Sequence, residues 1–234
     1  MYRIGVDEAG RGSLVGEMVV VAFAMRDGEE GALLEVGVRD SKKLSPARRA
    51  ELYKILRGWP FAAYAVHPRD IDSHNLNALE LKAVFEVLKS LYRRLGGGFR
   101  DARVTIDKFA DISSDLRRML DRLGFRGVLV VEEGADERYV EVSAASVIAK
   151  HLRDRRIQVL RSLYGVEGSG YPSDPRTLEW LARTLEAGVK PPIVRYSWAT
   201  LERFGLRARK GVRVTHKTLD EYLSSGIRGE DGIR

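Results

Sequence analysis

Apolar segments with the character of strands alternate along this chain with amphipathic segments, and this alternation constrains the fold more than any other feature of the sequence. The segments that we expect to be strands are residues 2–6, 16–25, 61–66, 102–106 and 127–131. The segments that we expect to be helices are residues 45–57, 75–95, 112–123, 143–164, 174–187 and around 198–204. Strands that alternate with helices predict an α/β fold, and the run of helices after residue 143 predicts a helical C-terminal part.

Two adjacent carboxylates, Asp7 and Glu8, follow the first expected strand directly, and Gly10-Arg11-Gly12 comes next. Open α/β sheets bind ligands at the carboxyl ends of their strands, and carboxylate oxygens are the hard ligands that suit Mg²⁺ and Mn²⁺. Glycines let the backbone turn sharply and approach a ligand closely. Because most acidic pairs are simply solvated, this pair becomes a candidate metal site only if further acidic residues join it.

Acidic residues also follow two later strands. Asp107 ends the strand expected over 102–106, and it lies close to Asp7 if those two strands are neighbours in the sheet. The fifth expected strand is followed by four more acids, which are Glu132, Glu133, Asp136 and Glu137. Physical reasoning alone does not choose among these four, so the sequence indicates a carboxylate cluster whose last member stays open.

The composition excludes several classes of function. The chain has no cysteine, which rules out disulfides and cysteine-based zinc sites, and its four histidines lack the HExxH spacing. No GxGxxG motif follows the first strand, which disfavours a Rossmann dehydrogenase. No apolar run approaches the ~18 residues of a membrane helix, so we expect a cytoplasmic protein without membrane contact. The net charge of +7 suits a polyanionic partner such as nucleic acid.

Five sequence blocks, in this order, resemble ribonuclease HII, the type 2 ribonuclease H, in its archaeal form. The blocks are residues 7–12 (DEAGRG), 40–44 (DSKKL), 143–150 (SAASVIAK), 168–175 (GSGYPSDP) and 191–195 (PPIVR), and Trp198 extends the match. The resemblance covers roughly residues 1–204. It implies a ribonuclease H-like fold, in which a five-stranded mixed sheet is flanked by helices and followed by a helical C-terminal part.

The resemblance also implies a metal-dependent endoribonuclease. The four acids that hold two Mg²⁺ or Mn²⁺ ions in the family fall on Asp7, Glu8, Asp107 and Asp136, the last from its position seven residues before the serine block. The family hydrolyses the RNA strand of RNA–DNA hybrids. It also cuts 5′ of ribonucleotides embedded in duplex DNA, leaves 3′-hydroxyl and 5′-phosphate ends, and so serves ribonucleotide excision in DNA replication and repair.

Substrate contacts follow from the same resemblance. The residues implied to bind substrate are Gly10, Arg11, Gly12, Lys42, Lys43, Lys150 and Tyr171. The glycine loop offers backbone groups to a 2′-hydroxyl, the tyrosine senses the RNA-to-DNA junction as a stacking platform, and the lysines contact phosphates. Taken singly, a glycine turn is more often a tight connection, a turn tyrosine a packing residue, and a lysine a solvated surface charge.

Several residues depart from the family pattern or invite a second interpretation. Ser13, Gly16-Glu17, Gly134 and Val140 stand where the family usually has other residues, and none of them removes a metal ligand. Residues 153–156 (RDRR) are expected to extend the basic face, although Asp154 can equally make local salt bridges. His151 and Trp198 are expected to be structural.

The C-terminal region predicts a separate tail. We expect a catalytic domain over 1–206 and a basic, flexible tail over 207–234. Residues 216–223 (HKTLDEYL) resemble a degenerate sliding-clamp-binding box, in which Leu219, Tyr222 and Leu223 fill a hydrophobic pocket of the clamp. The alternative is a nonspecific basic tail. Nothing in the sequence requires more than a monomer.

Two alternatives compete with a ribonuclease H. A catalytically silent nucleic-acid-binding module would keep the fold, but it predicts missing acids, and all four positions are filled. Another nuclease of the same superfamily, such as a resolvase or an exonuclease, would share the clustered acids. It would lack the combination of Gly-Arg-Gly with Gly-Tyr-Pro at residues 170–172, which is the discriminating feature.

Overall fold

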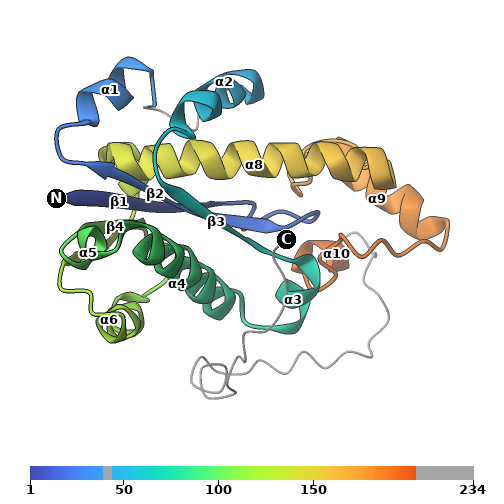
Figure 1. Ribbon diagram of the computed structural model, residues 1–234. Coiled ribbons are helices and arrows are strands. Elements are labelled where there is room, and N and C mark those ends of the chain that lie inside the picture. The colour runs from blue at the N-terminus through green and yellow to red at the C-terminus, as the bar shows by residue number, and fades with distance from the viewer. Residues whose placement is uncertain (39–43, 204–234) are drawn as a thin grey trace.

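A five-stranded sheet forms the centre of the computed structural model, which describes residues 1–38 and 44–203 (Figure 1). The strands are β1 (Tyr2–Ala9), β2 (Met18–Arg26), β3 (Phe61–Val66), β4 (Arg103–Asp107) and β5 (Val128–Glu132). Their order is β3-β2-β1-β4-β5. The first three strands pair antiparallel, whereas β1, β4 and β5 pair parallel, so the expected α/β fold with a mixed sheet is confirmed.

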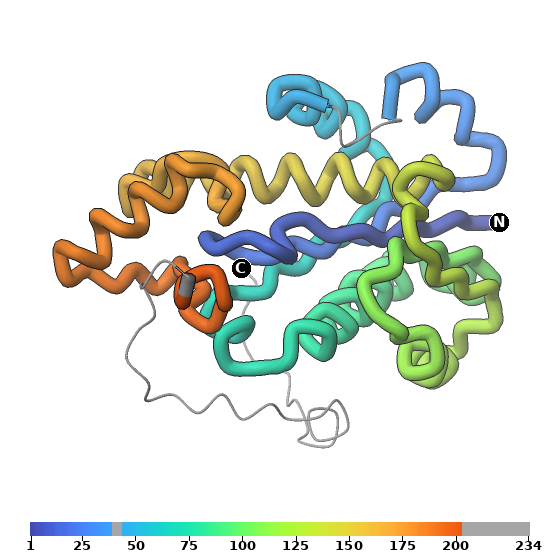
Figure 2. The backbone as a smooth tube through the Cα atoms, turned by 180° about the vertical axis from the view of Figure 1, so that it is seen from behind, coloured from blue at the N-terminus to red at the C-terminus, as the bar shows by residue number. Residues whose placement is uncertain are grey.

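Helices cover both faces of the sheet (Figures 1 and 2). One face carries the long helix α8 (Val140–Tyr164) with α1 (Glu30–Glu35) and α2 (Pro46–Leu56), and their apolar side chains pack with those of β2. The other face carries α4 (Leu76–Leu95), α5 (Gly97–Arg100) and α6 (Ser113–Arg122). The remaining helices are α3 (Pro68–Ser73), α7 (Ala135–Arg138), α9 (Pro175–Glu186) and α10 (Ala199–Arg203).

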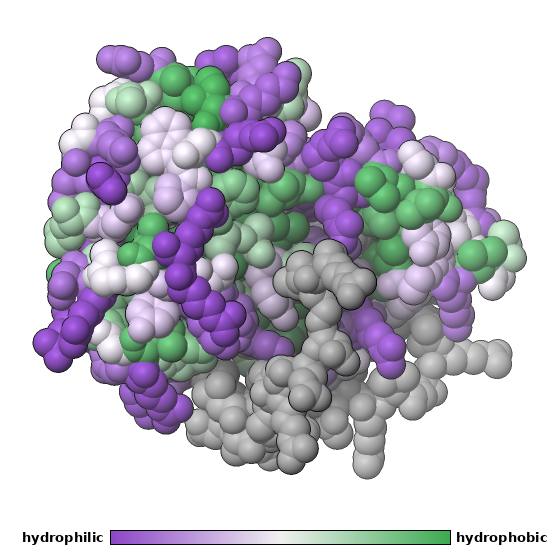
Figure 3. All heavy atoms as spheres, viewed as in Figure 1, coloured by the Kyte–Doolittle hydropathy of each residue, from purple (hydrophilic) through white to green (hydrophobic). Residues whose placement is uncertain are grey.

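A third apolar cluster joins the helical C-terminal part to the sheet domain. It contains Leu14 and Val15 from the segment before β2, Leu160 near the end of α8, Trp180 of α9 and Leu201 of α10. The C-terminal helices therefore pack on the same body as the sheet. Figure 3 shows hydrophilic side chains over much of one face of the molecule, with apolar patches between them. None of the helices in the described ranges is long and apolar enough to cross a membrane.

Helix α8 lies unusually close to the central strand. A Cβ atom placed on Gly5 would lie 2.2 Å from the carbonyl carbon of Glu141 and 2.3 Å from the amide nitrogen of Val142. Only a glycine leaves room for the helix backbone at this point. This contact fixes the height of α8 above β1, two residues before Asp7.

Some element boundaries differ from the expectation. Strand β1 continues through Ala9 because Asp7, Glu8 and Ala9 pair with Val21, Val20 and Val19 of β2, so the acidic pair lies within the strand end and not behind it. Helix α8 begins at Val140 and not at residue 143. The short helices α1 and α3 were not predicted, because each buries too few apolar residues to show a period.

Candidate active site

The carboxylates of three chain segments meet at one edge of the sheet. Val6 of β1 pairs with Ile106 of the parallel strand β4, so Asp7 and Asp107 are the next residues on neighbouring strands. Asp107 in turn pairs with Glu132 at the end of β5. The 100 residues that separate Asp7 from Asp107 in sequence thus become the spacing of two adjacent strands, as the sequence predicted.

Asp136 reaches the same place through a turn after β5. Gly134 adopts a left-handed conformation, with φ of 67°, and helix α7 begins at the next residue. The amide of Ala135 donates a hydrogen bond of 2.9 Å to Oδ1 of Asp107, which places Asp136 directly beside that interaction. Asp136 is 5% exposed, whereas Glu133 and Glu137 are exposed on the surface. Burial therefore singles out Asp136 from its acidic neighbours.

The environment of the first two carboxylates opposes their charge. Burial raises the pKa of Asp7 well above its usual value, and the charge of Glu8 raises it further, while a hydrogen bond from Ser146 and the charge of Lys150 lower it. Burial also raises the pKa of Glu8, Arg11 lowers it, and Asp107 raises it. Clustered anions of this kind are stabilised by a bound cation.

These carboxylate oxygens suit a divalent metal as ligands, and a bound cation would relieve the repulsion between their charges. In the described residues, however, no three acidic or histidine side chains already converge into a ready-made metal cage. Instead, Oδ1 of Asp7 accepts a hydrogen bond of 2.8 Å from the amide of Glu8, and Oδ1 of Asp107 accepts the one from Ala135. The structure brings Asp7, Glu8 and Asp107 to one sheet edge and Asp136 next to the Asp107 contact, without fixing their oxygens around one point.

Helix α8 supplies a serine and a lysine to this cluster. Nζ of Lys150 donates a hydrogen bond of 2.8 Å to Oγ of Ser146, and both side chains act on the charge of Asp7. Lys150 was predicted as a phosphate contact, and the structure places it at the carboxylates. Ser146 was not predicted as a site residue. Its signal in the sequence is its spacing, one helical turn before Lys150.

The Gly10-Arg11-Gly12 loop is exposed at Gly12, and its arginine side chain is anchored. The guanidinium of Arg11 forms an ion pair with the fully buried Glu80 of α4 and donates a hydrogen bond of 2.6 Å to Oδ1 of Asn77. A Cβ on Gly12 would meet no atom within 4 Å, so the loop is open at this residue. A ligand can therefore reach the backbone of this loop more easily than the side chain of Arg11.

A buried arginine that sequence reasoning missed holds the same loop from behind. Arg195 is 0% exposed, donates from Nε and Nη2 to the carbonyl of Gly16 at 3.1 and 2.9 Å, and donates from Nη1 to the carbonyl of Arg11 at 2.7 Å. Burial lowers its pKa to about 10. Its only signal in the sequence is an arginine directly after the apolar Pro191–Val194 segment.

Tyr171 lies in a turn that is bonded to the segment behind the glycine loop. The carbonyl of Gly170 accepts hydrogen bonds from the amides of Leu14 and Val15, at 2.8 and 3.2 Å. The ring of Tyr171 stacks on the guanidinium of Arg153, whose Cζ lies 4.2 Å from the ring centroid. The structure therefore brings Tyr171 and the Gly10–Gly12 loop into one assembly.

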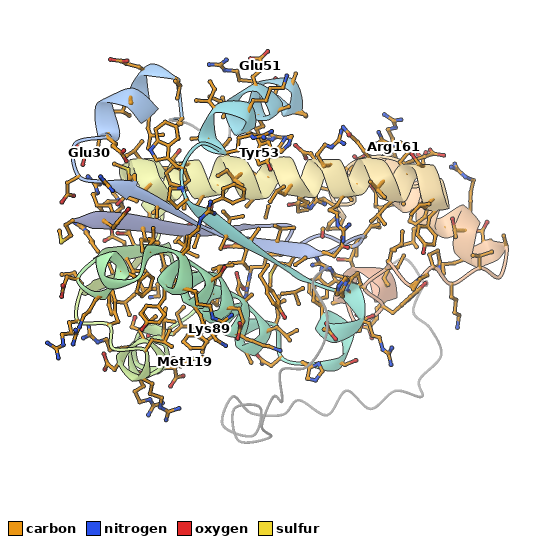
Figure 4. The ribbon with its side chains drawn as sticks, viewed as in Figure 1. Glu30, Glu51, Tyr53, Lys89, Met119 and Arg161 are labelled. Carbon is orange, nitrogen blue, oxygen red and sulfur yellow. The ribbon has the colours of Figure 1, made fainter. Side chains whose placement is uncertain are left out.

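The charged segment after Lys150 forms only part of the expected basic face, and Asp154 makes an ion pair, as the alternative interpretation allowed. Arg153 is 6% exposed, and Asp154 accepts a hydrogen bond of 2.6 Å from Arg49 of α2. Helical periodicity turns Arg153 inward, while Arg155 and Arg156 stay outside. His151 stacks on Tyr53 of α2 with 4.3 Å between ring centroids, which agrees with a structural role. Figure 4 labels Tyr53, which lies between α2 and α8.

Two of the departures from the family pattern have local explanations. Ser13 is buried, and its hydroxyl donates a hydrogen bond of 2.9 Å to the carbonyl of Gly10, which closes the loop. Gly134 supplies the left-handed turn before α7. The remaining predicted site residues lie outside the described residues, and these are Lys42, Lys43, Leu219, Tyr222 and Leu223.

Comparisons with known proteins agree with this geometry. The family model for Ribonuclease HII matches residues 4–201. A Ribonuclease HII of Aeropyrum pernix is 48% identical over 225 residues, which cover 94% of this chain and 97% of that protein. The crystal structure of ribonuclease H2 from Pyrococcus horikoshii is 35% identical with a TM-score of 0.74, and the match covers 90% of this chain and 100% of that one.

A second solved structure is that of the complex between PCNA and RNase HII from Archaeoglobus fulgidus. It is 34% identical, has a TM-score of 0.73, and covers 94% of this chain and 99% of that one. The sheet order, the clustered carboxylates and these matches over nearly the whole chain lead to one conclusion. The chain belongs to the ribonuclease HII family and is a metal-dependent ribonuclease H.

Proposed function

We propose that this enzyme cleaves the RNA strand of RNA–DNA hybrids and cuts 5′ of ribonucleotides embedded in duplex DNA, leaving 3′-hydroxyl and 5′-phosphate ends. The observation that carries the proposal is the meeting of Asp7, Glu8 and Asp107 at one sheet edge, with Asp136 beside them. Membership of the family supports the reaction class. The charge of +7 supports a polyanionic substrate.

The same four residues are our candidates for holding two Mg²⁺ or Mn²⁺ ions. In this proposal the carboxylates of Asp7, Glu8, Asp107 and Asp136 would hold the two ions. Bound divalent ions supply stabilisation of the charge that develops on the attacking and leaving oxygens of a phosphodiester. Lys150, which already acts on Asp7, adds positive charge where the scissile phosphate would bind.

Recognition of RNA is assigned to the loop and the turn beside the carboxylates. The backbone of Gly10–Gly12 offers amides and carbonyls to the 2′-hydroxyl, the group that distinguishes RNA from DNA. Tyr171 offers a ring on which a sugar can stack next to the cleavage point. Lys42 and Lys43 are proposed to contact phosphates, which positions the duplex without reading its sequence.

Strand scission of a DNA duplex that carries one ribonucleotide tests the function, with Mg²⁺, with Mn²⁺ and with EDTA. We expect metal-dependent cutting only at the 5′ side of the ribonucleotide, and no cutting of an all-DNA duplex. Asp7→Asn should abolish turnover while substrate binding remains. Cleavage of a long hybrid without cleavage at the single ribonucleotide would reject the excision role. No cleavage of either substrate would favour the nucleic-acid-binding module.

We also propose that the C-terminal tail binds a DNA sliding clamp through Leu219, Tyr222 and Leu223. The complex of the Archaeoglobus fulgidus relative with PCNA supports this partner class, and the aliphatic and aromatic spacing of residues 216–223 supports the position. The clamp of the same organism should pull down the wild-type enzyme but not the Tyr222→Ala variant. Binding that survives deletion of residues 212–234 would reject the assignment.

A further inference from the structure

The two segments that we assign to RNA recognition meet at a single buried side chain. Arg153 extends from α8 to the point where the Gly10 loop and the Ser169–Tyr171 turn come together. Backbone hydrogen bonds from Leu14 and Val15 to Gly170 already join the two segments. Arg153 fills the space behind this junction, so it contacts both segments at once.

The contacts of Arg153 with the tyrosine turn are specific in geometry. Nη2 donates a hydrogen bond of 2.8 Å to the carbonyl of Ser169, and the planar guanidinium lies 4.2 Å from the centroid of the Tyr171 ring. An arginine can satisfy both contacts together because its donors lie in the plane that stacks on the ring. One face of the ring is thereby covered, which leaves the other for a ligand.

The contact of Arg153 with the glycine loop is equally close. A Cβ on Gly10 would lie 2.8 Å from Cδ and 2.8 Å from Nε of Arg153, and a Cβ on Gly170 would lie 3.1 Å from Nη2. Both glycines also have positive φ, of 84° and 82°. The arginine therefore packs against bare backbone on each side, so its position sets the separation of the two segments.

Stability alone does not explain an arginine here. Arg153 is 6% exposed, so its charge is largely removed from water. The acid next to it in sequence, Asp154, is hydrogen-bonded to Arg49. A buried guanidinium whose hydrogen bond goes to a carbonyl and whose plane lies on an aromatic ring recovers only part of the cost of removing its charge from water.

We propose that Arg153 is a positioning residue for substrate recognition, which holds the ring of Tyr171 at a fixed place relative to the Gly10 loop. A 2′-hydroxyl at the loop and the following sugar at the ring would then be read at one fixed separation. This inference rests on the proposed function of the two segments. It predicts that Arg153 affects substrates with an RNA-to-DNA junction more than substrates without one.

Steady-state cleavage of two substrates by four variants tests the inference. The substrates are a DNA duplex with one ribonucleotide and a uniform RNA–DNA hybrid. The variants are Arg153→Lys, Tyr171→Ala, the double variant, and Arg156→Lys as a matched control. Arg156 lies on the same helix and is exposed, where it pairs with Glu17. The readout is the ratio of kcat/KM for the two substrates, which does not depend on the fraction of enzyme that is folded.

We expect Arg153→Lys, which keeps the charge but loses the planar fork, to lower this ratio by about 10- to 100-fold, since misplacement of a reacting group by ~1 Å can cost about 100-fold. Tyr171→Ala should lower the ratio similarly, and the double variant should be no worse than Tyr171→Ala. Arg156→Lys should leave the ratio unchanged. The inference would be overturned if Arg153→Lys left the ratio unchanged, or if the double variant lowered it by the product of the two single effects.

The outcomes also separate this inference from the proposed function. If the wild-type enzyme does not cut the single-ribonucleotide duplex, or if Tyr171→Ala leaves the ratio unchanged, the proposed recognition mode is wrong and the inference is overturned with it. If both behave as proposed and only Arg153→Lys resembles wild type, the recognition mode stands. In that case the positioning role of Arg153 alone is rejected.

Discussion

Replacement of Arg195 by methionine should destabilise the enzyme strongly, although this residue lies in the C-terminal segment, far in sequence from the loop that it supports. Its guanidinium is fully buried and donates three hydrogen bonds to the carbonyls of Gly16 and Arg11. Methionine fills most of the same space, so the cavity that remains is small. The main effect is the loss of donors for the buried carbonyl of Gly16 and the partly buried carbonyl of Arg11.

The magnitude follows from those two acceptors. A buried polar group that loses its partner costs about 1–3 kcal/mol, so the two carbonyls together cost about 2–6 kcal/mol. Removal of a buried charge offsets part of this cost, since desolvating a cation opposes folding. We therefore expect a loss of about 3 kcal/mol in the free energy of unfolding, which lies within the range for single substitutions in a protein core. For a chain of this length that loss lowers Tm by roughly 6–12 °C.

Urea denaturation followed by circular dichroism measures this loss, with Arg122→Met as the control. Arg122 lies at the end of α6 and is exposed, so its replacement should change the free energy of unfolding by less than about 0.5 kcal/mol. Arg195→Lys should fall between methionine and wild type, because one ammonium cannot reproduce the fork. A loss below about 1 kcal/mol for Arg195→Met, with an unchanged m-value, would refute the reasoning. It would show that water satisfies the two carbonyls.

Three further predictions concern the sheet edge and its supports. Because burial raises the pKa of Asp7, the folded state holds the Asp7 proton more tightly than the unfolded state, so the stability of the metal-free enzyme should fall as pH rises through that raised pKa. Asp7→Asn should weaken this pH dependence and raise the Tm measured in EDTA at pH 7. A Tm below that of the wild type would contradict the prediction. Gly5→Ala should lower the free energy of unfolding by about 3 kcal/mol or more, because the alanine Cβ would overlap the backbone of α8. Urea denaturation measures this loss, and stability near that of the wild type would show that α8 can move away from β1. Burial lowers the pKa of His151, so the contribution of its neutral ring to stability should be lost as pH falls below about 6.5, the ordinary histidine value. Thermal melts of His151→Phe between pH 5 and 8 should show a flatter dependence of Tm on pH than those of the wild type. An equal slope would mean that other groups cause the pH dependence.

The sheet and the acidic cluster were predictable because both follow from local patterns. Apolar runs marked each strand of the sheet, and three of those runs ended near acids. The rule that parallel strands align their carboxyl ends then brought Asp7 and Asp107 together. Physical reasoning stopped at the four acids after β5. The structure separates Asp136 from them by burial, a property that depends on how α7 packs against β4.

The supports of the site were not predictable, since they depend on contacts across long sequence separations. Arg195 donates to a carbonyl 179 residues away, and a carbonyl partner leaves no mark in the sequence. Arg153 stood in a charged run that indicates a solvated face, whereas its position on α8 turns it beneath Tyr171. In both cases the partner is a backbone group or a ring, so no pattern of opposite charges points to it.

The sheet order also has a consequence for how activity arises during synthesis. Strands β1, β2 and β3 are consecutive in the chain and pair antiparallel, so they can associate once the first 66 residues are available. Strand β4 pairs with β1 only after residue 107 exists, and the Gly10 loop gains its support from Arg195 later still. The first carboxylates to be translated thus belong to a site whose loop is supported by Arg195, 184 positions after Arg11. A nascent chain that stalls before residue 195 is expected to hold its nucleic-acid-cutting residues without the loop geometry to use them, which ties the onset of nuclease activity to the synthesis of Arg195.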